Sequence, residues 1–144
     1  MFTGEYTHGV DEKGRFIVPA KIREELGLSF MLTRGMDGCL FAYTLLEWQK
    51  VIENLASISG NKKKIRDLKR YILGGAVECE VDRQGRCLIP AKLREDASIN
   101  SELHIIGVGT KLEIWDKEVW NSYEDDDTNI DPEAIAEEYD FIDL

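Results

Sequence analysis

The stretch Asp11-Glu-Lys-Gly-Arg-Phe-Ile-Val-Pro-Ala-Lys-Ile-Arg-Glu24 recurs 71 residues later as Asp82-Arg-Gln-Gly-Arg-Cys-Leu-Ile-Pro-Ala-Lys-Leu-Arg-Glu95. Eight of the fourteen positions are identical, and Ile17/Leu88 is one of three differing pairs that stay aliphatic. The match then resumes one residue out of register, so that Trp48 corresponds to Trp120. Self-similarity at a fixed spacing indicates a supersecondary unit that is present more than once. We therefore expect one fold unit written twice.

Each copy is expected to form the same series of elements. A strand leads through a tight turn at Gly14 or Gly85, where glycine tolerates a positive φ, into a second, short strand. A brief helix follows, and Pro19 or Pro90 suits its first turn because a missing N–H costs nothing there. A hairpin comes next. The expected ranges are 5–10, 15–18, 19–26, 30–34 and 39–43 in the first copy, and 76–81, 86–89, 90–97, 103–107 and 111–115 in the second.

Each copy is expected to close with a helix that carries an aromatic anchor. Thr44 and Glu47 form a capping-box pattern that opens the first of these helices, which runs to about residue 56. Asp116 suits the N-cap position of the second. The tryptophan side chains are expected to pack in the core or at subunit contacts rather than to stack on bases.

The chain divides into four parts at the sequence level. Residues 1–60 form the first repeat, residues 61–74 a bridging helix, residues 75–123 the second repeat and residues 124–144 a tail. Apolar residues at helical spacing predict that the bridging helix is amphipathic, and two glycines end it. In the tail, Asp131 suits an N-cap and Pro132 a first-turn position, which predicts a short helix at residues 133–139.

Charge is distributed unevenly along the chain. The sequence has 28 acidic and 18 basic residues and a net charge of −10. Residues 124–144 contain ten of the acidic residues and no lysine or arginine, which leaves 18 of each sign in residues 1–123. An electroneutral body therefore carries an acidic tail, and the net charge of the whole chain says little about the surface of the body.

The repeat also indicates the fold class. Two strand pairs from one copy cannot close a barrel, whereas strands from both copies can interleave and so remove exposed sheet edges. A hydrophobic fraction of 43% is sufficient for a core. We therefore expect an α+β fold, an internally duplicated β-barrel with pseudo-twofold symmetry and short flanking helices.

Several classes of function are not indicated. Cys39, Cys79 and Cys87 form no Cys-x-x-Cys pair and are expected to be small buried residues. His8 and His104 have no cysteine or carboxylate at ligand spacing. No phosphate loop or nucleophile motif is present, so we expect no enzyme activity, metal, cofactor or small-molecule substrate. Neither a signal peptide nor a membrane span is indicated, which predicts a cytoplasmic protein.

The two Asp-x-x-Gly-Arg loops, each leading into Pro-Ala-Lys-Ile/Leu-Arg-Glu, and the start Met1-Phe-Thr-Gly-Glu5 resemble the MraZ family of bacterial transcriptional regulators. The resemblance covers about residues 1–123 and leaves the tail outside. It implies a double-split β-barrel related to AbrB-type (SpoVT-AbrB) DNA-binding domains. It also implies a ring-shaped homo-oligomer at the nucleoid that binds short direct repeats in promoter DNA and represses its own division and cell-wall operon.

In that family the two loops form the DNA-contacting surface, which corresponds here to the first loop (residues 11–15) and the second loop (residues 82–86). Arg15 and Arg86 suit this role, because a guanidinium can fork onto guanine O6 and N7 or onto phosphate. A carboxylate facing phosphate would repel it, so the acidic residues are assigned a structural role. The residues expected to hold the loops in shape are Asp11, Gly14, Asp82 and Gly85. The nearby basic residues expected to neutralise phosphates are Lys13, Lys21, Arg23, Arg83, Lys92 and Arg94.

Three features remain open to a second interpretation. The aspartate and arginine of each loop could simply pair across an exposed turn. The basic segment at residues 62–70 could contact the DNA backbone, or it could solvate the outer face of a helix or contact another subunit. The acidic tail could fold over the arginine loops and compete with phosphate, or it could serve solubility or subunit contacts.

Two other functions are compatible with the same loops. A ring-forming scaffold could use the arginines to bind acidic proteins, and an antitoxin-like AbrB relative would bind both DNA and a toxin. Antitoxins usually carry one loop copy per chain, so the fused duplication argues against the latter. Salt dependence separates the scaffold from a DNA-binding protein, because phosphate contacts release counterions.

Overall fold

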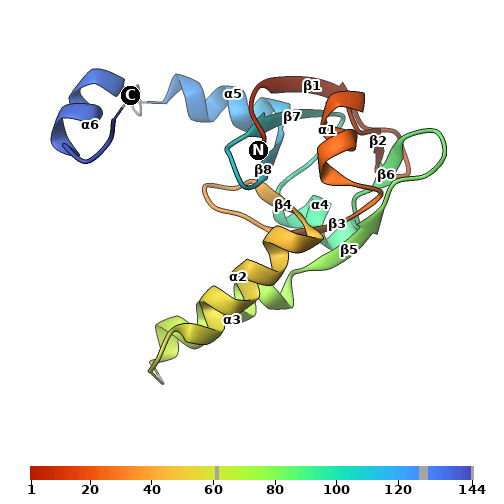
Figure 1. The fold of residues 1–144 in the computed structure, drawn as a ribbon. Helices are drawn as coiled ribbons and strands as arrows, with labels where there is room; N and C mark the ends of the chain where they lie inside the picture. Colours follow the sequence, from red (N-terminus) through yellow and green to blue (C-terminus); the bar gives the residue numbers. More distant parts are fainter. Residues whose placement is uncertain (61, 127–129, 144) are drawn as a thin grey trace.

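The computed structural model describes residues 1–60, 62–126 and 130–143, and these form eight strands and six helices (Figure 1). The first copy contains β1 (Glu5–Gly9), β2 (Arg15–Ile17), α1 (Ala20–Leu26), β3 (Ser29–Arg34), β4 (Leu40–Thr44) and α2 (Leu45–Ser57). After α3 (Lys63–Gly74), the second copy contains β5 (Val77–Glu80), β6 (Arg86–Leu88), α4 (Ala91–Asp96), β7 (Glu102–Gly107), β8 (Leu112–Asp116) and α5 (Lys117–Asp125). The last helix is α6 (Pro132–Glu138). The predicted start of the bridging helix at Asn61 and tail residues 127–129 and 144 lie outside the described residues.

Strands from the two copies alternate in one antiparallel sheet, in the order β1-β7-β8-β4-β3-β5. β1 pairs with β7 and β5 pairs with β3, so the first strand of each copy joins the hairpin of the other. β4 and β8 pair at the centre, where Phe41 lies opposite Glu113. β2 and β6 form a separate two-stranded ribbon. The predicted interleaving of the two copies is therefore confirmed.

The sheet is not closed, contrary to the prediction of a closed barrel. Within the described residues, the edge strands β1 and β5 do not pair with each other. Each edge strand turns instead into a strand of the ribbon, and Val81 forms a further bridge to Cys87 beside β5. The edge strands are only five and four residues long, which limits the unpaired backbone that they expose. The sheet therefore stays open, with two short edge strands that each continue into the ribbon.

Two groups of buried side chains stabilise this arrangement. One fills the space that the sheet, the ribbon, α1 and α4 enclose, and it includes Phe30 and Ile114. The other lies on the outer face of the sheet against α2, α3 and α5, and it includes Trp48 and Trp115, as expected for packing residues. Burying each large apolar side chain contributes about 1.5–3 kcal/mol. The structure has three free thiols, and all three are buried as the sequence predicted: Cys39, Cys79 and Cys87.

The helix starts follow the sequence closely. Thr44, Asp116 and Asp131 each accept a hydrogen bond from the backbone N–H three residues later, at 3.1–3.2 Å, which confirms the predicted caps. Pro19 and Pro90 lie at the N-cap rather than in the first turn. The reason is their extended ψ angles of 136° and 145°, with the proline carbonyl accepting the first helical hydrogen bond.

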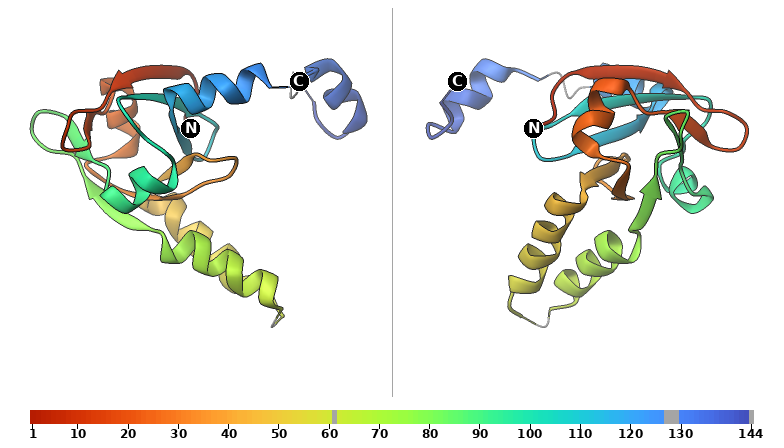
Figure 2. Two further views of the ribbon diagram at one scale, coloured as in Figure 1. Left: turned by 180° about the vertical axis from the view of Figure 1, so that it is seen from behind. Right: turned by 45° about the vertical axis from the view of Figure 1, so that its right-hand side comes forward.

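Helices α2 and α3 project from the sheet, away from the end of the molecule that carries the ribbon (Figure 2). On α3, Lys63 and Arg70 pair with Asp67 at 2.5 and 3.1 Å, and Gly75 caps the helix as predicted. No helix within the described ranges is long and apolar enough to cross a membrane.

Candidate nucleic-acid interface

The first loop is organised by the carboxylate of Asp11. Its Oδ1 atom accepts hydrogen bonds from the backbone N–H groups of Lys13 and Arg15, both at 2.9 Å. Its Oδ2 atom accepts a hydrogen bond from Nε of Arg15 at 2.8 Å. The backbone closes the turn, because Gly14 N donates to the Asp11 carbonyl at 3.0 Å. One side chain thus fixes both the turn and the orientation of the arginine.

The second loop repeats this geometry. Oδ1 of Asp82 accepts from the backbone N–H groups of Gln84 and Arg86, at 2.9 and 2.8 Å, and Oδ2 accepts from Nε of Arg86 at 2.9 Å. Corresponding distances in the two loops differ by at most 0.1 Å. The two arginine side chains are also similarly accessible, at 31% and 34% exposure. The chain therefore presents two copies of one arginine-bearing loop.

These hydrogen bonds also favour the charged form of both carboxyl groups. Hydrogen bonding from the backbone N–H of Arg15 holds the pKa of Asp11 below its usual value of 3.8, and Arg86 has the same effect on the pKa of Asp82. Each aspartate is consequently an anionic hydrogen-bond acceptor that is already engaged by its own loop.

The two loops are joined to each other through the ribbon. Val18 N donates to the carbonyl of Gly85 at 2.9 Å, and Ile89 N donates to the carbonyl of Gly14 at 2.9 Å. Both loops therefore lie at the same end of the molecule, in both views of Figure 2. A pocket of about 340 Å³ is lined by the side chains of both loop arginines. Residues that are 71 positions apart in the sequence thus form one surface.

The loop glycines contact the opposite copy. Gly14 and Gly85 have φ angles of +88° and +80°, a backbone region that strongly favours glycine. A Cβ atom on Gly14 would lie 2.5 Å from Nε of Arg94, and a Cβ atom on Gly85 would collide with the guanidinium of Arg23. Nε of Arg94 also donates to the carbonyl of Ile89 at 3.0 Å. Each loop is thus packed against an arginine of the other copy.

The predicted phosphate-binding residues fall into two groups. Lys13 and Arg83 are exposed in the turns, and Lys21 and Lys92 are exposed on α1 and α4. Of these, Lys92 pairs with Asp96 at 2.7 Å. Arg23 and Arg94, by contrast, are half-buried against the loop glycines, a packing role that the sequence did not indicate. The assignment of all six residues to phosphate contact stays a prediction.

Ile17 and Leu88 are the surface residues of the ribbon that sequence reasoning did not assign to a site. They occupy equivalent positions in the two copies and are 52% and 49% exposed. The signal was present in the sequence, because side chains two residues apart on a strand lie on the same face. Ile17 therefore shares a face with Arg15, and Leu88 shares one with Arg86.

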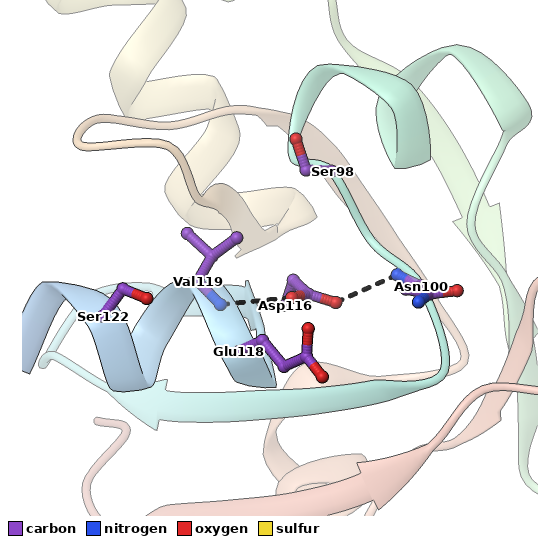
Figure 3. A pocket seen from close by; sticks show the side chains of 6 residues that line it. All are labelled: Ser98, Asn100, Asp116, Glu118, Val119 and Ser122. Atoms are coloured by element: carbon purple, nitrogen blue, oxygen red, sulfur yellow. Dashed lines mark hydrogen bonds between the residues drawn. The ribbon is translucent and has the colours of Figure 1, made fainter.

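A second pocket lies at the start of α5 (Figure 3). Asp116, at its centre, accepts hydrogen bonds from the backbone N–H of Asn100 at 2.9 Å and of Val119 at 3.2 Å. The two oxygens of this buried carboxylate are therefore used to fix local structure. In the described residues, no group of three or more His, Cys, Asp or Glu side chains is placed to hold a metal ion.

The sequence is similar along its whole length to proteins named "Transcriptional regulator MraZ". The relative from Thermoanaerobacter sp. (strain X514) is 50% identical over 144 residues, which is 100% of both chains. The relative from Caldanaerobacter subterraneus subsp. tengcongensis is 52% identical over 140 residues, or 97% of each chain. The relative from Acetivibrio thermocellus is 51% identical over 137 residues, or 95% of each chain.

The family model described as "MraZ protein, putative antitoxin-like" matches the chain twice, at residues 1–71 and 72–140. This match and the full-length relatives extend past residue 123, so the prediction that the tail lies outside the resemblance is wrong. The chain belongs to the MraZ family.

Proposed function

We propose that this protein binds double-stranded DNA in a sequence-specific manner and thereby regulates transcription. The observation that carries the proposal is the pair of arginine loops, held in the same geometry on one two-stranded ribbon. The major groove of B-DNA admits a two-stranded β-ribbon, and each base pair presents a distinct set of donors and acceptors there. The name of the relatives, transcriptional regulator, agrees with this function.

The loops suit base recognition because the contact with aspartate leaves the terminal amino groups of the arginine for a ligand. Asp11 engages Arg15 at Nε, and Asp82 engages Arg86 at Nε. The Nη1 and Nη2 atoms of each guanidinium can then donate a pair of hydrogen bonds to guanine O6 and N7. Because the aspartate fixes the side chain beforehand, less conformational entropy is lost on binding. The aspartates thus position the arginines and do not contact DNA.

Phosphate contacts would be made around this centre. Lys13 and Arg83 extend from the loops, and Lys21 and Lys92 lie on the helices that follow the ribbon. These four residues are proposed to neutralise phosphates on either side of the groove. Arg23 and Arg94 are proposed to act mainly by supporting the loops, adding positive charge close to the DNA.

An assembly would explain how an electroneutral body binds a polyanion. One ribbon with two arginines offers few contacts, whereas a ring would repeat the ribbon and gain avidity on tandem sites. In this proposal the sheet and ribbon together correspond to the double-split barrel of the family. The ring acts in the cytoplasm at the nucleoid, where it binds direct repeats in the promoter of its division and cell-wall operon and represses it.

Two alternatives use the same surface differently. A scaffold would bind acidic protein segments through the arginines, and an antitoxin-like protein would bind a toxin as well as DNA. The antitoxin description in the family name keeps the second possibility relevant. Both loops are already supplied by one chain, however, so no dimerisation is needed to complete the ribbon. The geometry therefore favours DNA binding.

The test is fluorescence anisotropy on the duplex from upstream of the protein's own coding sequence, with a scrambled duplex of the same composition as comparison. The full-length protein, Arg15→Ala/Arg86→Ala and the control Lys63→Ala/Arg70→Ala would be measured at several salt concentrations. We expect tight, salt-dependent binding to the upstream duplex, which the loop variant loses and the α3 variant retains. Equal weak binding to both duplexes, insensitive to the loop substitutions, would favour the scaffold.

A further inference from the structure

The ribbon exposes two aliphatic side chains between its arginines. Side chains alternate between the two faces of a strand. On β2 and β6 the inward residues Phe16 and Cys87 are 4% and 2% exposed, whereas the outward residues Ile17 and Leu88 are 52% and 49% exposed. Both copies place an aliphatic residue at this position. Neither side chain fills the core, so both are available for a contact on the outer surface.

The register of the ribbon interleaves these residues with the arginines. Arg15 lies opposite Leu88, and Ile17 lies opposite Arg86. Directly opposed residues of an antiparallel pair have Cβ atoms about 4.5–5.5 Å apart. Residues two positions apart on one strand are separated by about 7 Å. The outer face therefore has four corners, with the arginines on one diagonal and the aliphatic residues on the other.

We infer that Ile17 and Leu88 contact the methyl groups of thymines next to the guanines that Arg15 and Arg86 read. This inference rests on the proposed function. The thymine methyl is the apolar group of the major groove, and successive bases on one strand are about 3.4 Å apart. A side chain that lies 5–7 Å from the arginine Cβ can reach a base one or two steps away. The two copies together therefore read a guanine-thymine pattern rather than guanines alone.

The flanking charges argue for DNA as the occupant of this surface. An apolar protein partner that covered Ile17 and Leu88 would also bury the guanidinium groups of Arg15 and Arg86. The loop aspartates bond only to Nε of each guanidinium, so the Nη1 and Nη2 atoms would lose water without gaining an acceptor, which is costly. A DNA groove satisfies both kinds of side chain, since it offers acceptors to the guanidinium groups and methyl groups to the aliphatic residues.

The experiment removes the methyl group from the DNA rather than from the protein alone. The duplex from upstream of the coding sequence would be compared with the same duplex in which deoxyuridine replaces every thymidine, which deletes only the 5-methyl groups. Wild-type protein, Ile17→Ala/Leu88→Ala and the control Val108→Ala would be titrated with both duplexes. Val108 is 43% exposed and follows β7, outside the ribbon. The oligomeric state of each variant would be measured by light scattering.

We expect the wild type and Val108→Ala to bind the deoxyuridine duplex about fourfold more weakly for each methyl group contacted, which is the factor for burying one methyl-sized group. Ile17→Ala/Leu88→Ala should bind both duplexes with the same, reduced affinity. The inference would be overturned if the wild type did not distinguish the duplexes while Arg15→Ala/Arg86→Ala still lost binding, a result that leaves the proposed function intact. It would equally be overturned if Ile17→Ala/Leu88→Ala still bound the thymidine duplex more tightly than the deoxyuridine duplex, whatever its oligomeric state.

Discussion

Replacing Gly14 with alanine is expected to destabilise the protein by about 3 kcal/mol, through two separable effects. The first is backbone strain, because φ at Gly14 is +88° and an L-residue in this region costs roughly 1–2 kcal/mol. The second is displacement of Arg94, since the new Cβ would lie 2.5 Å from its Nε and 2.6 Å from its Cζ. Moving that side chain breaks the 3.0 Å hydrogen bond to Ile89, a charged hydrogen bond worth about 1.5 kcal/mol or more.

Gly38→Ala is the matched control. Its φ is +97°, but a Cβ there would meet no atom within 4 Å, so only the backbone cost of about 1–2 kcal/mol applies. In the background of Arg94→Ala, Gly14→Ala should likewise cost only this backbone strain. The double-mutant cycle should therefore give a coupling of about 1.5 kcal/mol between Gly14 and Arg94.

The wild type and the four variants would be compared by urea unfolding at one fixed protein concentration, because stability depends on concentration if the chains associate. Equal costs for Gly14→Ala and Gly38→Ala would refute the packing of Arg94 against the first loop. A coupling near zero would refute it independently, even if the single substitution proved costly.

Three further predictions concern other parts of the fold. Hydrogen bonds from backbone N–H groups hold the pKa values of Asp11 and Asp82 below 3.8, so ionisation of these two carboxyl groups stabilises the fold. This stabilisation is fully present above pH 3.8 and is lost as the pH falls through the lower pKa values of the folded protein. Asp11→Asn/Asp82→Asn should thus flatten the acid arm of urea midpoints measured from pH 5 to pH 2, and an unchanged acid arm would contradict this. Asp116→Ala should lower the free energy of unfolding by about 2 kcal/mol and Thr44→Ala by about 1 kcal/mol, because Asp116 accepts a second backbone hydrogen bond, from Asn100. Thermal unfolding measures both variants, and equal losses of stability would contradict this difference. Burial raises the pKa of Cys39 to about 12, and all three thiols are buried, so a thiol reagent at pH 8 should label them only on unfolding rather than rapidly in the native protein.

The duplication predicted more of the fold than local propensity could. Because each copy contains the same strands, the sequence predicted that the copies exchange strands and so expose fewer edges, and β1 with β7 and β5 with β3 are equivalent exchanges. Closure of the sheet was predicted wrongly from the same reasoning. Hydrophobic pattern and turn residues identify strands, but whether two short edges meet depends on the twist and length of the strands between them.

The loops show the same division between local and tertiary information. Asp11 was predicted to hold the first loop because a carboxylate facing phosphate would repel it. Its hydrogen bonds with the backbone N–H groups of Lys13 and Arg15 could also have been predicted from the spacing, because an aspartate side chain readily accepts from backbone N–H groups a few residues later. The packing of Arg94 against Gly14 could not be predicted, since it depends on how the two copies dock. Ile17 could have been placed beside Arg15 from strand alternation alone.

The most direct test of the central claim is the ratio of affinities for the upstream and scrambled duplexes in Arg15→Lys/Arg86→Lys. Lysine keeps the positive charge but cannot form the forked pair of hydrogen bonds that arginine forms with guanine. If the loops read bases, the ratio should fall at least about tenfold, since each bidentate contact contributes about 1–3 kcal/mol, while the salt dependence of binding to scrambled DNA stays the same. An unchanged ratio would mean that Arg15 and Arg86 contribute only charge, and that sequence is read elsewhere.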